Sequence, residues 1–314
     1  MPKREKPFLT YPELIDKLKS KGMVINDADL AIHTLKKYGY YSLICGYKGP
    51  FKNKTTKQYI DGTRFEDIVK LYEFDKALRE HFLHYLLLIE AKIKVAVAHC
   101  FSEKYTEQQE MYLNPKNYDF TTKRNKEDIA KLTDKLRMPI ESYSYPYIMH
   151  AKIEHNNVPL WVLFNAISFG VVSKMYTLLP LDLKTTIAKE YARVKVPDLE
   201  SMLLLTSRCR NKCAHGERLY SFHNKEALSA MPLHDKLKIP QKGSEYKYGQ
   251  KDLFAVVIAL RYLLDDSDFK TFKSELAKMI DKYVVNNSVG SNEDIFEAMG
   301  FPSNWKNITR YRNY

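Results

Sequence analysis

The longest uninterrupted stretch of this chain, residues 63–114, contains neither glycine nor proline. Its apolar residues recur at spacings of three and four, the period that buries one face of an α-helix. A capping box at Thr63 and Glu66 marks its start. We therefore expect one long helix to be the central scaffold of the protein. The apolar series consists of Phe65, Ile68, Val69, Tyr72, Leu78, Phe82, Leu86 and Ile89.

Helix signals also dominate the rest of the chain. A capping box at Thr10 and Glu13 opens a short helix that stops before Gly22, and Asn26 or Asp27 caps a second helix that ends at Gly39. No convincing alternation of apolar and polar residues predicts a strand. The predicted fold class is all-α. Further helices are expected over about 125–155, 160–179, 182–192, 198–215, 251–264 and 268–285, with a short one from Ser291 to Gly300.

The predicted elements fall into three regions. Residues 1–62 form an N-terminal helical region with a basic and aromatic loop, and residues 63–220 form a helical core. Residues 221–314 hold a second basic loop and C-terminal helices that pack on the core. The two loops, 42–62 and 221–250, are rich in glycine, proline and lysine. We expect such long loops to be functional or disordered rather than structural.

The charge of the chain favours a polyanionic partner. Fifty Lys and Arg against 38 Asp and Glu give a formal net charge of +12, which attracts nucleic acid by steering and counterion release. A protein from a lysine-rich proteome would have the same excess without such a partner. The four cysteines form no CxxC pair, and no segment resembles a targeting signal or a membrane span. We expect reduced thiols and a cytoplasmic protein.

The stretch from Arg210 to Tyr220 carries the groups needed to cut RNA without a metal. Arg210, Asn211 and His215 lie within six residues at the predicted end of a helix, with Gly216 as the helix stop. A guanidinium neutralises a phosphate, an imidazole moves a proton, and an amide orients one or the other. Glu217 is the only acid nearby in sequence. The crowded cations therefore favour a bound anion over a capping histidine among solvated arginines.

Arg-x4-His by itself is a weak pattern, because the chain matches it three times. The match at Arg79 and His84 lies within the long helix, where five residues turn the side chains about 140° apart. Asp75 precedes Arg79 by four residues, so we interpret this match as a structural charged ladder. The third match, Arg218 and His223, runs through the helix end, and His223 has no assigned role.

Other side chains have both a binding and a structural interpretation. Tyr40, Tyr41 and Tyr47 lie near Lys48, and tyrosines interleaved with lysines can clamp single-stranded RNA. Tyrosine is equally at home in a core. No histidine has suitable partners for a metal site, so we expect no metal and structural roles for His81, His84, His150 and His155. Trp161 and Trp305 are expected to anchor the core.

The motif and its flanks resemble the Abi-like abortive-infection proteins of bacteria, the AbiD/AbiF group, and the wider HEPN ribonuclease superfamily. The resemblance runs over about residues 6–306. Besides Arg210-Asn211-x-x-Ala214-His215-x-x-Arg218-Leu219-Tyr220, it rests on Tyr40-Tyr41, Gly46-Tyr47, Gly62-Thr63-x-Phe65, Leu71-Tyr72-x-Phe74-Asp75-x-x-Leu78-Arg79, Ile89-Glu90, Val158-Pro159-Leu160-Trp161, Ser168-Phe169-Gly170 and Met299-Gly300-Phe301-Pro302-x-x-Trp305.

The resemblance implies a HEPN-type helical bundle and a metal-independent endoribonuclease of an anti-phage, toxin–antitoxin-like system, without a cofactor. It also implies a homodimer whose two motifs form one composite site, and a small non-coding RNA as regulator. On this reading Arg210, Asn211 and His215 are catalytic. The expected RNA contacts are Arg208, Lys212, Arg218, Tyr40, Tyr41, Tyr47 and Lys48.

The mechanism that we expect is attack of the RNA 2′-OH on the adjacent phosphorus, with His215 as general base or acid and Arg210 stabilising the phosphoryl charge. One rival is a binding module that holds a structured non-coding RNA through the same basic site without cutting it. A second rival is a toxin that acts on another macromolecule, with its positive charge incidental.

Overall fold

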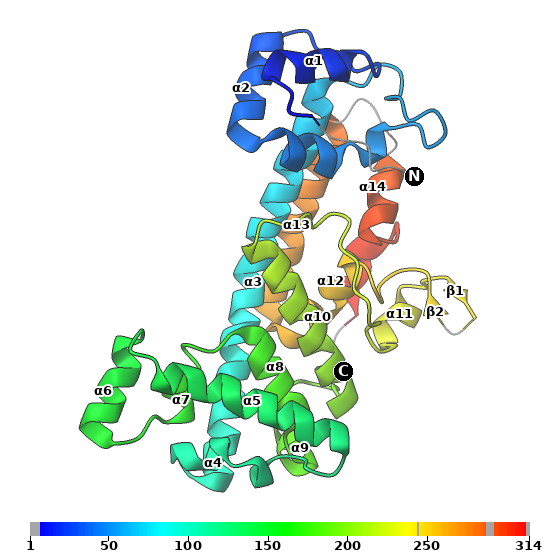
Figure 1. Ribbon diagram of the computed structural model, residues 1–314. Coiled ribbons are helices and arrows are strands. Elements are labelled where there is room, and N and C mark those ends of the chain that lie inside the picture. The colour runs from blue at the N-terminus through cyan, green and yellow to red at the C-terminus, as the bar shows by residue number, and fades with distance from the viewer. Residues whose placement is uncertain (1–6, 244, 287–291, 312–314) are drawn as a thin grey trace.

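One long helix forms the axis of the molecule. The computed structural model describes residues 7–243, 245–286 and 292–311. Helix α3 (Phe65–Tyr105) has 41 residues, and at 1.5 Å per residue it is about 60 Å long (Figure 1). Buried side chains lie on several of its sides, because α7 to α10, α12 and α13 all pack against it. The predicted scaffold helix is confirmed, as is the all-α class.

The start of α3 differs from the sequence expectation by one residue. Arg64 is the N-cap, and its backbone N–H donates to Asp67 Oδ2 at 2.9 Å. Thr63, expected to be the cap, instead donates its hydroxyl to the Ile60 carbonyl at 2.6 Å. A parallel bridge between Val24 and Arg64 ties the N-terminal segment to this point.

The N-terminal residues pack around the first turns of α3. They form α1 (Tyr11–Lys19), α2 (Ala28–Tyr38), a π-helical turn (Tyr41–Cys45) and a 3-10 turn (Gly49–Phe51). The expected caps are confirmed: the Thr10 N–H donates to Glu13 at 2.6 Å, and Asp27 accepts from the Leu30 N–H at 2.9 Å.

The other end of α3 is surrounded by shorter helices than the sequence suggests. The stretch expected as one helix over 125–155 divides between Glu141 and Pro146. Ser142 is extended after α5, and Tyr145 is extended before α6, as is usual for a residue that precedes a proline. The stretch 160–179 likewise divides, with Ser168 extended. The elements here are α4 (Gln109–Leu113), a 3-10 turn (Pro115–Asn117), α5 (Lys123–Glu141), α6 (Pro146–His155), α7 (Leu160–Leu163), α8 (Phe169–Leu178) and α9 (Leu181–Ala188).

The second basic loop is a packed structural segment, which corrects the expectation for residues 221–250. It contains α11 (Pro232–Lys236) and an antiparallel hairpin of β1 (Gln241–Lys242) and β2 (Glu245–Tyr246), with Gln241 opposite Tyr246. Its lysines suggested an open loop, but its apolar side chains are buried. The buried ones are Phe222, Leu228, Met231, Leu233, Leu237 and Ile239.

The remaining helices are α10 (Val196–Ala214), α12 (Leu253–Leu263), α13 (Asp266–Asn286), α14 (Asn292–Met299) and a 3-10 turn (Trp305–Arg310). In Figure 1, α10 runs beside the middle of α3, and α13 lies along α3 on another side. Within the described ranges, no helix is both long and apolar enough to cross a bilayer.

Asp252 holds three segments of the C-terminal region together. As the N-cap of α12 it accepts from the Ala255 N–H at 3.0 Å and from the Gly249 N–H at 2.9 Å. Gly300 packs directly over its carboxyl group, where a Cβ would lie 2.1 Å from Asp252 Cγ. Burial raises the pKa of Asp252 to about 6, while the hydrogen bonds from the Gly249 and Ala255 amides act in the opposite direction.

The raised pKa predicts a specific pH dependence of stability. The folded value of about 6 exceeds the reference value of 3.8, so the folded protein binds this proton more tightly and loses stability as the pH rises through that window. Asp252→Asn keeps a capping side chain but cannot ionise. Between pH 4 and 7, wild type should therefore lose about 2–3 kcal/mol more than the variant, at ~1.4 kcal/mol for each pKa unit. Urea unfolding at both pH values measures this difference.

A matched control for that experiment is Asp16→Asn, on the exposed face of α1. Its free energy of unfolding should follow wild type across the same pH range. Parallel pH profiles for wild type and Asp252→Asn would contradict the assignment.

Candidate functional site

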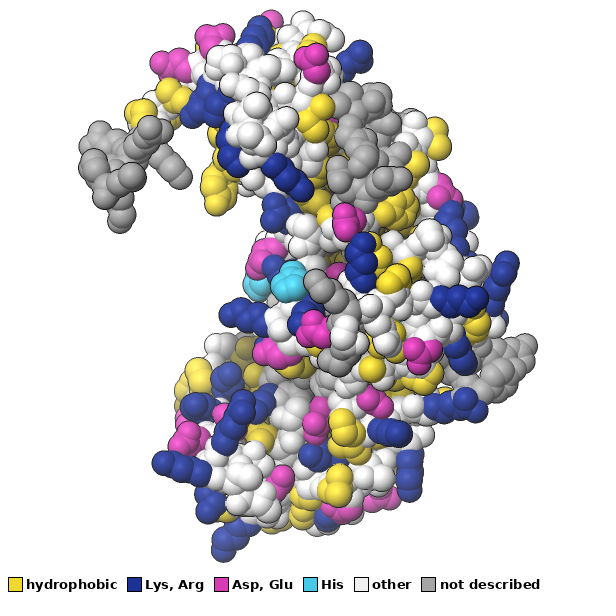
Figure 2. Space-filling view, turned by 90° about the vertical axis from the view of Figure 1, so that its right-hand side faces the viewer, with side chains coloured by type: hydrophobic (Ala, Val, Ile, Leu, Met, Phe, Trp, Pro, Cys, Tyr) yellow, Lys and Arg dark blue, Asp and Glu magenta, His cyan; other side chains and the backbone are white. Residues whose placement is uncertain are grey.

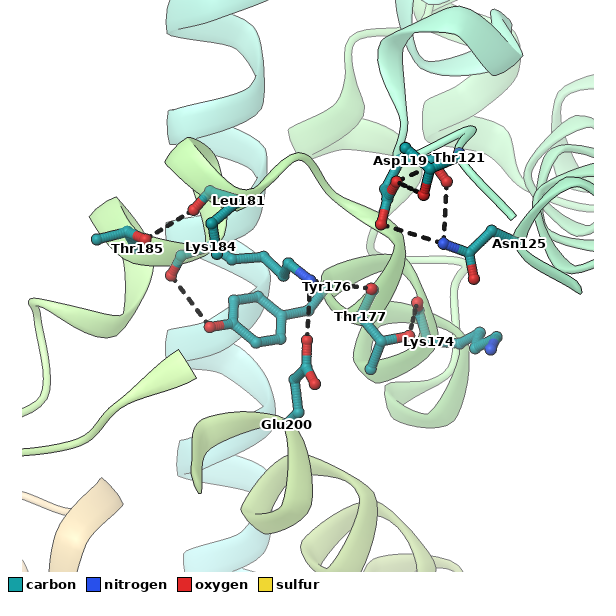
Figure 3. Close-up of polar contacts among 10 residues, drawn as sticks. All are labelled: Asp119, Thr121, Asn125, Lys174, Tyr176, Thr177, Leu181, Lys184, Thr185 and Glu200. Atoms are coloured by element: carbon teal, nitrogen blue, oxygen red, sulfur yellow. Dashed lines mark hydrogen bonds and ion pairs between the residues drawn. The ribbon is translucent and has the colours of Figure 1, made fainter. Parts of the chain in front are cut away.

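Helix α10 carries the sequence motif and is held in place by contacts with neighbouring helices. Its first half is tied to α9 by an ion pair between Lys184 Nζ and Glu200 Oε1 at 3.1 Å, and the Lys184 carbonyl accepts from the Tyr176 hydroxyl of α8 at 3.0 Å (Figure 3). The apolar side of the helix faces α3 and α8. The buried members of that side include Leu199, Met202, Leu203 and Leu205. A motif at the far end of such a helix has little freedom to move.

The helix ends at the histidine of the motif. Gly216 has φ +67°, and the Glu217 N–H donates to the Lys212 carbonyl at 2.9 Å, which is the Schellman arrangement that glycine favours. His215 is the C-cap residue, and its own N–H donates to the Asn211 carbonyl at 2.9 Å. The predicted stop at Gly216 is confirmed, and it places the imidazole at an exposed helix terminus.

Arg210 turns away from this terminus toward α3. Its Nε donates to Glu90 Oε2 at 2.9 Å, and the other oxygen of Glu90 pairs with Lys94 at 2.8 Å. The Arg210 side chain is 26% exposed, whereas that of Glu90 is almost fully buried. Among the described residues, the terminal nitrogens of Arg210 have no hydrogen-bond partner. The carboxylate therefore orients the guanidinium and leaves its outer donors for another oxyanion.

The cations of the motif have carboxylate partners, which corrects the charge argument made from sequence. Arg208 forms a two-pronged ion pair with Glu226 and also donates to Asn224 Oδ1 at 2.9 Å. Lys212 pairs with Glu217 at 2.8 Å. Glu217 is thus not the only acid nearby, because folding brings Glu90 and Glu226 to the motif. Repulsion among the cations does not by itself require a bound anion.

Asn211 and His215 lie one helical turn apart, and both are exposed. Neither side chain has a hydrogen-bond partner within the part of the chain that the structure describes. In this conformation the Asn211 amide binds neither the imidazole nor a backbone group of the described residues. What the arrangement offers is an open imidazole with an amide beside it.

Arg218 connects the motif to the N-terminal region. Its Nη1 donates to the Gly46 carbonyl at 2.5 Å, and the guanidinium lies 5.8 Å from the centre of the Tyr220 ring. Arg218 itself is exposed. Arg218 therefore lies beside the N-terminal loop that carries other expected RNA contacts.

The aromatic loop presents one open ring. Tyr41 is 81% exposed, and Tyr40 and Lys48 are partly buried. Tyr47 is only 3% exposed, and its hydroxyl donates to Asp75 Oδ2 at 2.6 Å. The expectation that Tyr47 stacks on RNA is wrong for this conformation, because its ring is part of the core.

Asp75 of α3 anchors the chain that follows the motif. Its carboxylate accepts from the backbone N–H groups of Leu219 at 3.1 Å and Tyr220 at 2.5 Å. It also accepts from Tyr47 and from Arg79 Nη1, the latter at 2.5 Å. Burial raises the pKa of Asp75, against the opposing effect of these hydrogen bonds. The sequence indicated the Asp75–Arg79 pair but gave no sign of its two amide partners.

The Arg79/His84 match is not a second open site. The Arg79 guanidinium is buried and occupied by Asp75 and the Tyr47 hydroxyl, as the structural interpretation predicted. His84 is exposed and packs edge-on against Tyr85. His81 Nε2 donates to the Phe272 carbonyl at 2.9 Å, and its ring stacks on the Phe272 ring, so its role is structural.

Two further residues complete the comparison with expectation. Trp305 is buried, as predicted, but Trp161 is 52% exposed and borders a hollow beside α3. The prediction that Trp161 anchors the core is wrong.

Among the described residues, no group of three or more His, Cys, Asp or Glu side chains could hold a metal ion. In Figure 2, histidines lie midway along the face, at its left edge, with side chains of both charges around them.

Replacing Asp75 should release the segment after the motif. Asp75→Asn leaves Arg79 buried without its counter-charge, so the free energy of unfolding should fall by about 3–5 kcal/mol. Tyr47→Phe removes the two hydrogen bonds of the Tyr47 hydroxyl, to Asp75 and from Arg79, and should cost about 1–3 kcal/mol. Urea unfolding gives both values. In the milder variant, amide hydrogen exchange at Leu219 and Tyr220 should remain slow, whereas in Asp75→Asn it should accelerate; equal protection in the two variants would refute the anchor.

Comparison with known proteins identifies a family for this chain. The model of the Abi-like protein family matches residues 33–221, which span α3, the aromatic loop and the motif on α10. No curated protein and no solved structure matches the chain. A family match over more than half of the sequence shows membership, and the family supports a role in abortive infection. The chain therefore belongs to the Abi-like protein family.

Proposed function

We propose that this chain is a metal-independent endoribonuclease of the HEPN type, of the AbiD/AbiF group, acting in an anti-phage abortive-infection system. The observation that carries the proposal is the imidazole of His215, which is exposed, lacks an intramolecular partner in the described chain, and stands at the end of α10, five residues after an arginine whose guanidinium Glu90 orients. An open imidazole is the general acid or base that RNA cleavage needs.

The chemistry follows from the RNA itself. The 2′-oxygen attacks the adjacent phosphorus as its proton passes to a base, and the P–O5′ bond breaks as the leaving oxygen takes a proton from an acid. The products are a 2′,3′-cyclic phosphate and a free 5′-OH. The outer donors of Arg210 would stabilise the charge on the phosphoryl oxygens. Asn211, one turn from His215, would bind the same phosphate or the ribose.

One imidazole cannot be the base and the acid of the same step. Two copies of the chain would supply two, so the proposal includes a homodimer with a composite site. Each copy would contribute Arg210 and His215, and the histidines would serve opposite roles.

Basic surfaces away from the motif support RNA as the partner. A hollow of about 290 Å³ between α5 and α8 is lined by Lys131 and Lys135, and by Lys174, which pairs with Asp128 at 2.7 Å. Figure 3 shows the Lys174 side chain extending away from Lys184 and Glu200. Such surfaces suit a substrate RNA or a small non-coding RNA that restrains the enzyme.

A second lysine group lies on the N-terminal region. Burial and the nearby charges of Lys21, Lys48 and Lys57 lower the pKa of Lys52. Among these four lysines, Lys48 is one of the expected RNA contacts. Phosphate groups of an RNA chain would relieve their mutual repulsion.

A second candidate function is an RNA-binding module without catalysis. It is favoured by the lysine groups away from the motif, which could bind RNA whether or not His215 transfers a proton. Such a module would hold a structured RNA with salt-sensitive affinity and release no products.

The test is cleavage of labelled RNA in excess EDTA. Wild type should cut, and His215→Ala should lower the rate by a factor of about 10²–10⁴, the usual contribution of a general acid or base. RNA affinity should change by less than about threefold, because one imidazole adds little to the many phosphate contacts of a basic surface. Gel analysis of products and fluorescence anisotropy of binding provide the two readouts.

Matched controls come from the other two copies of the pattern. His84→Ala and His223→Ala remove exposed histidines at the same spacing from an arginine, and both should retain the wild-type rate. Undiminished cutting by His215→Ala would end the nuclease proposal. Salt-sensitive binding without products by wild type would favour the binding module.

A further inference from the structure

We propose that the hollow beside Arg210, between α3 and α7, receives one unstacked nucleobase of the RNA substrate, which stacks on the ring of Trp161. The inference rests on the proposed function, since it names the part of the RNA that the same site recognises. It assigns a role to a tryptophan that the fold leaves open to solvent.

The hollow has a volume of about 350 Å³, at the lower end of the range for small-molecule sites. One wall is a stripe of α3 formed by Leu87, Ala91 and Val95, spaced by four residues. The opposite wall carries Trp161 and Asn165. Its shape and lining suit a flat, largely apolar group with polar edges.

The side chains of this surface are unusually exposed for their type. Trp161 is 52% exposed and Val95 is 69% exposed, whereas Leu160 and Leu163 of the same short helix α7 are buried. Burying a large apolar side chain is worth about 1.5–3 kcal/mol, so the fold leaves that gain unused here. The described part of the chain places no aromatic ring against Trp161. An aromatic ring held open in this way is a stacking platform for a base.

Polar groups are placed where the edge of a base would lie. Asn165 Nδ2 donates to the carbonyls of Trp161 and Val162, both at 3.1 Å, which fixes the amide and leaves Oδ1 as an acceptor. That oxygen can accept from an exocyclic amino group or a ring N–H. An apolar slot with a fixed polar edge therefore suits a nucleobase better than a hydrocarbon without polar groups.

The hollow is connected to Arg210 through Glu90. Glu90 lines it, and the same carboxylate accepts from Arg210 Nε at 2.9 Å and pairs with Lys94 at 2.8 Å. Two cations around one anion leave a net positive rim. A nucleotide could thus place its phosphate toward Arg210 while its base enters the slot, a juxtaposition that suits single-stranded RNA.

The experiment uses the full-length His215→Ala variant, so that RNA stays intact. The chain has two tryptophans, and Trp305 is buried, so quenching by a stacked base reports on Trp161. Titration with a single-stranded oligoribonucleotide should quench tryptophan fluorescence. The quench should vanish in His215→Ala/Trp161→Phe. An abasic sugar-phosphate oligomer of equal length should bind without quenching.

Affinity gives the second readout. In the same background, Trp161→Ala should weaken RNA binding about 5- to 150-fold, as expected for 1–3 kcal/mol of stacking per base. Ile153→Ala, an exposed apolar residue on α6, is the matched control and should bind RNA as the parent does. Binding of the abasic oligomer should be the same with and without Trp161.

Several results would overturn the inference. They are RNA binding without quenching, equal quenching by the abasic oligomer, no RNA binding at all, or a Trp161 signal that depends on protein concentration without RNA. The last result would assign the surface to a second copy of the chain. Because no step needs cleavage, quenching by an RNA that wild type does not cut would refute the nuclease and keep the base site. Cleavage at an equal rate with and without the Trp161 ring would refute the base site and keep the nuclease.

Discussion

Two buried carboxylates on one helix determine how the motif is presented. Glu90 and Asp75 lie on the same long α3, and each reaches a different side of the motif: Glu90 binds the Arg210 side chain, and Asp75 binds the backbone after His215. A charge buried in a helix bundle must be paired and hydrogen-bonded, or it destabilises the fold by several kcal/mol. The pairing therefore holds the motif to α3. In the sequence, the exposed His215 lies between the two anchored points, Arg210 and Leu219.

Local sequence signals predicted much of the fold. The glycine-free and proline-free run predicted α3, and Gly216 predicted the end of α10, because each signal acts within a few residues. Pro146 is a local signal for a helix boundary, whereas the apolar pattern that continues across it favoured one helix over 125–155. The packing of residues 221–250 depends on tertiary contacts such as those of buried Leu228 and Leu233, which no local pattern reveals.

The residues of the candidate site stay a prediction from the sequence, and their contacts in the fold could not be predicted from it. Arg210 finds Glu90 from 120 residues away, and Asp75 finds Leu219 from 144 residues away, so neither contact leaves a mark on sequence spacing. The same limit explains Tyr47, which was grouped with exposed Tyr41 although its ring is in the core. Trp161 shows the converse: its type suggests burial, but its short helix faces outward beside the hollow.

The most direct test of the proposed chemistry is the nature of the RNA ends made by wild type in excess EDTA. Attack by the 2′-OH with His215 as the proton-transfer group predicts fragments ending in a 2′,3′-cyclic phosphate and beginning with a 5′-OH. Fragments with a 3′-OH and a 5′-phosphate would mean that water, not the ribose, is the nucleophile. That result would contradict the proton-transfer role proposed for the imidazole at the end of α10.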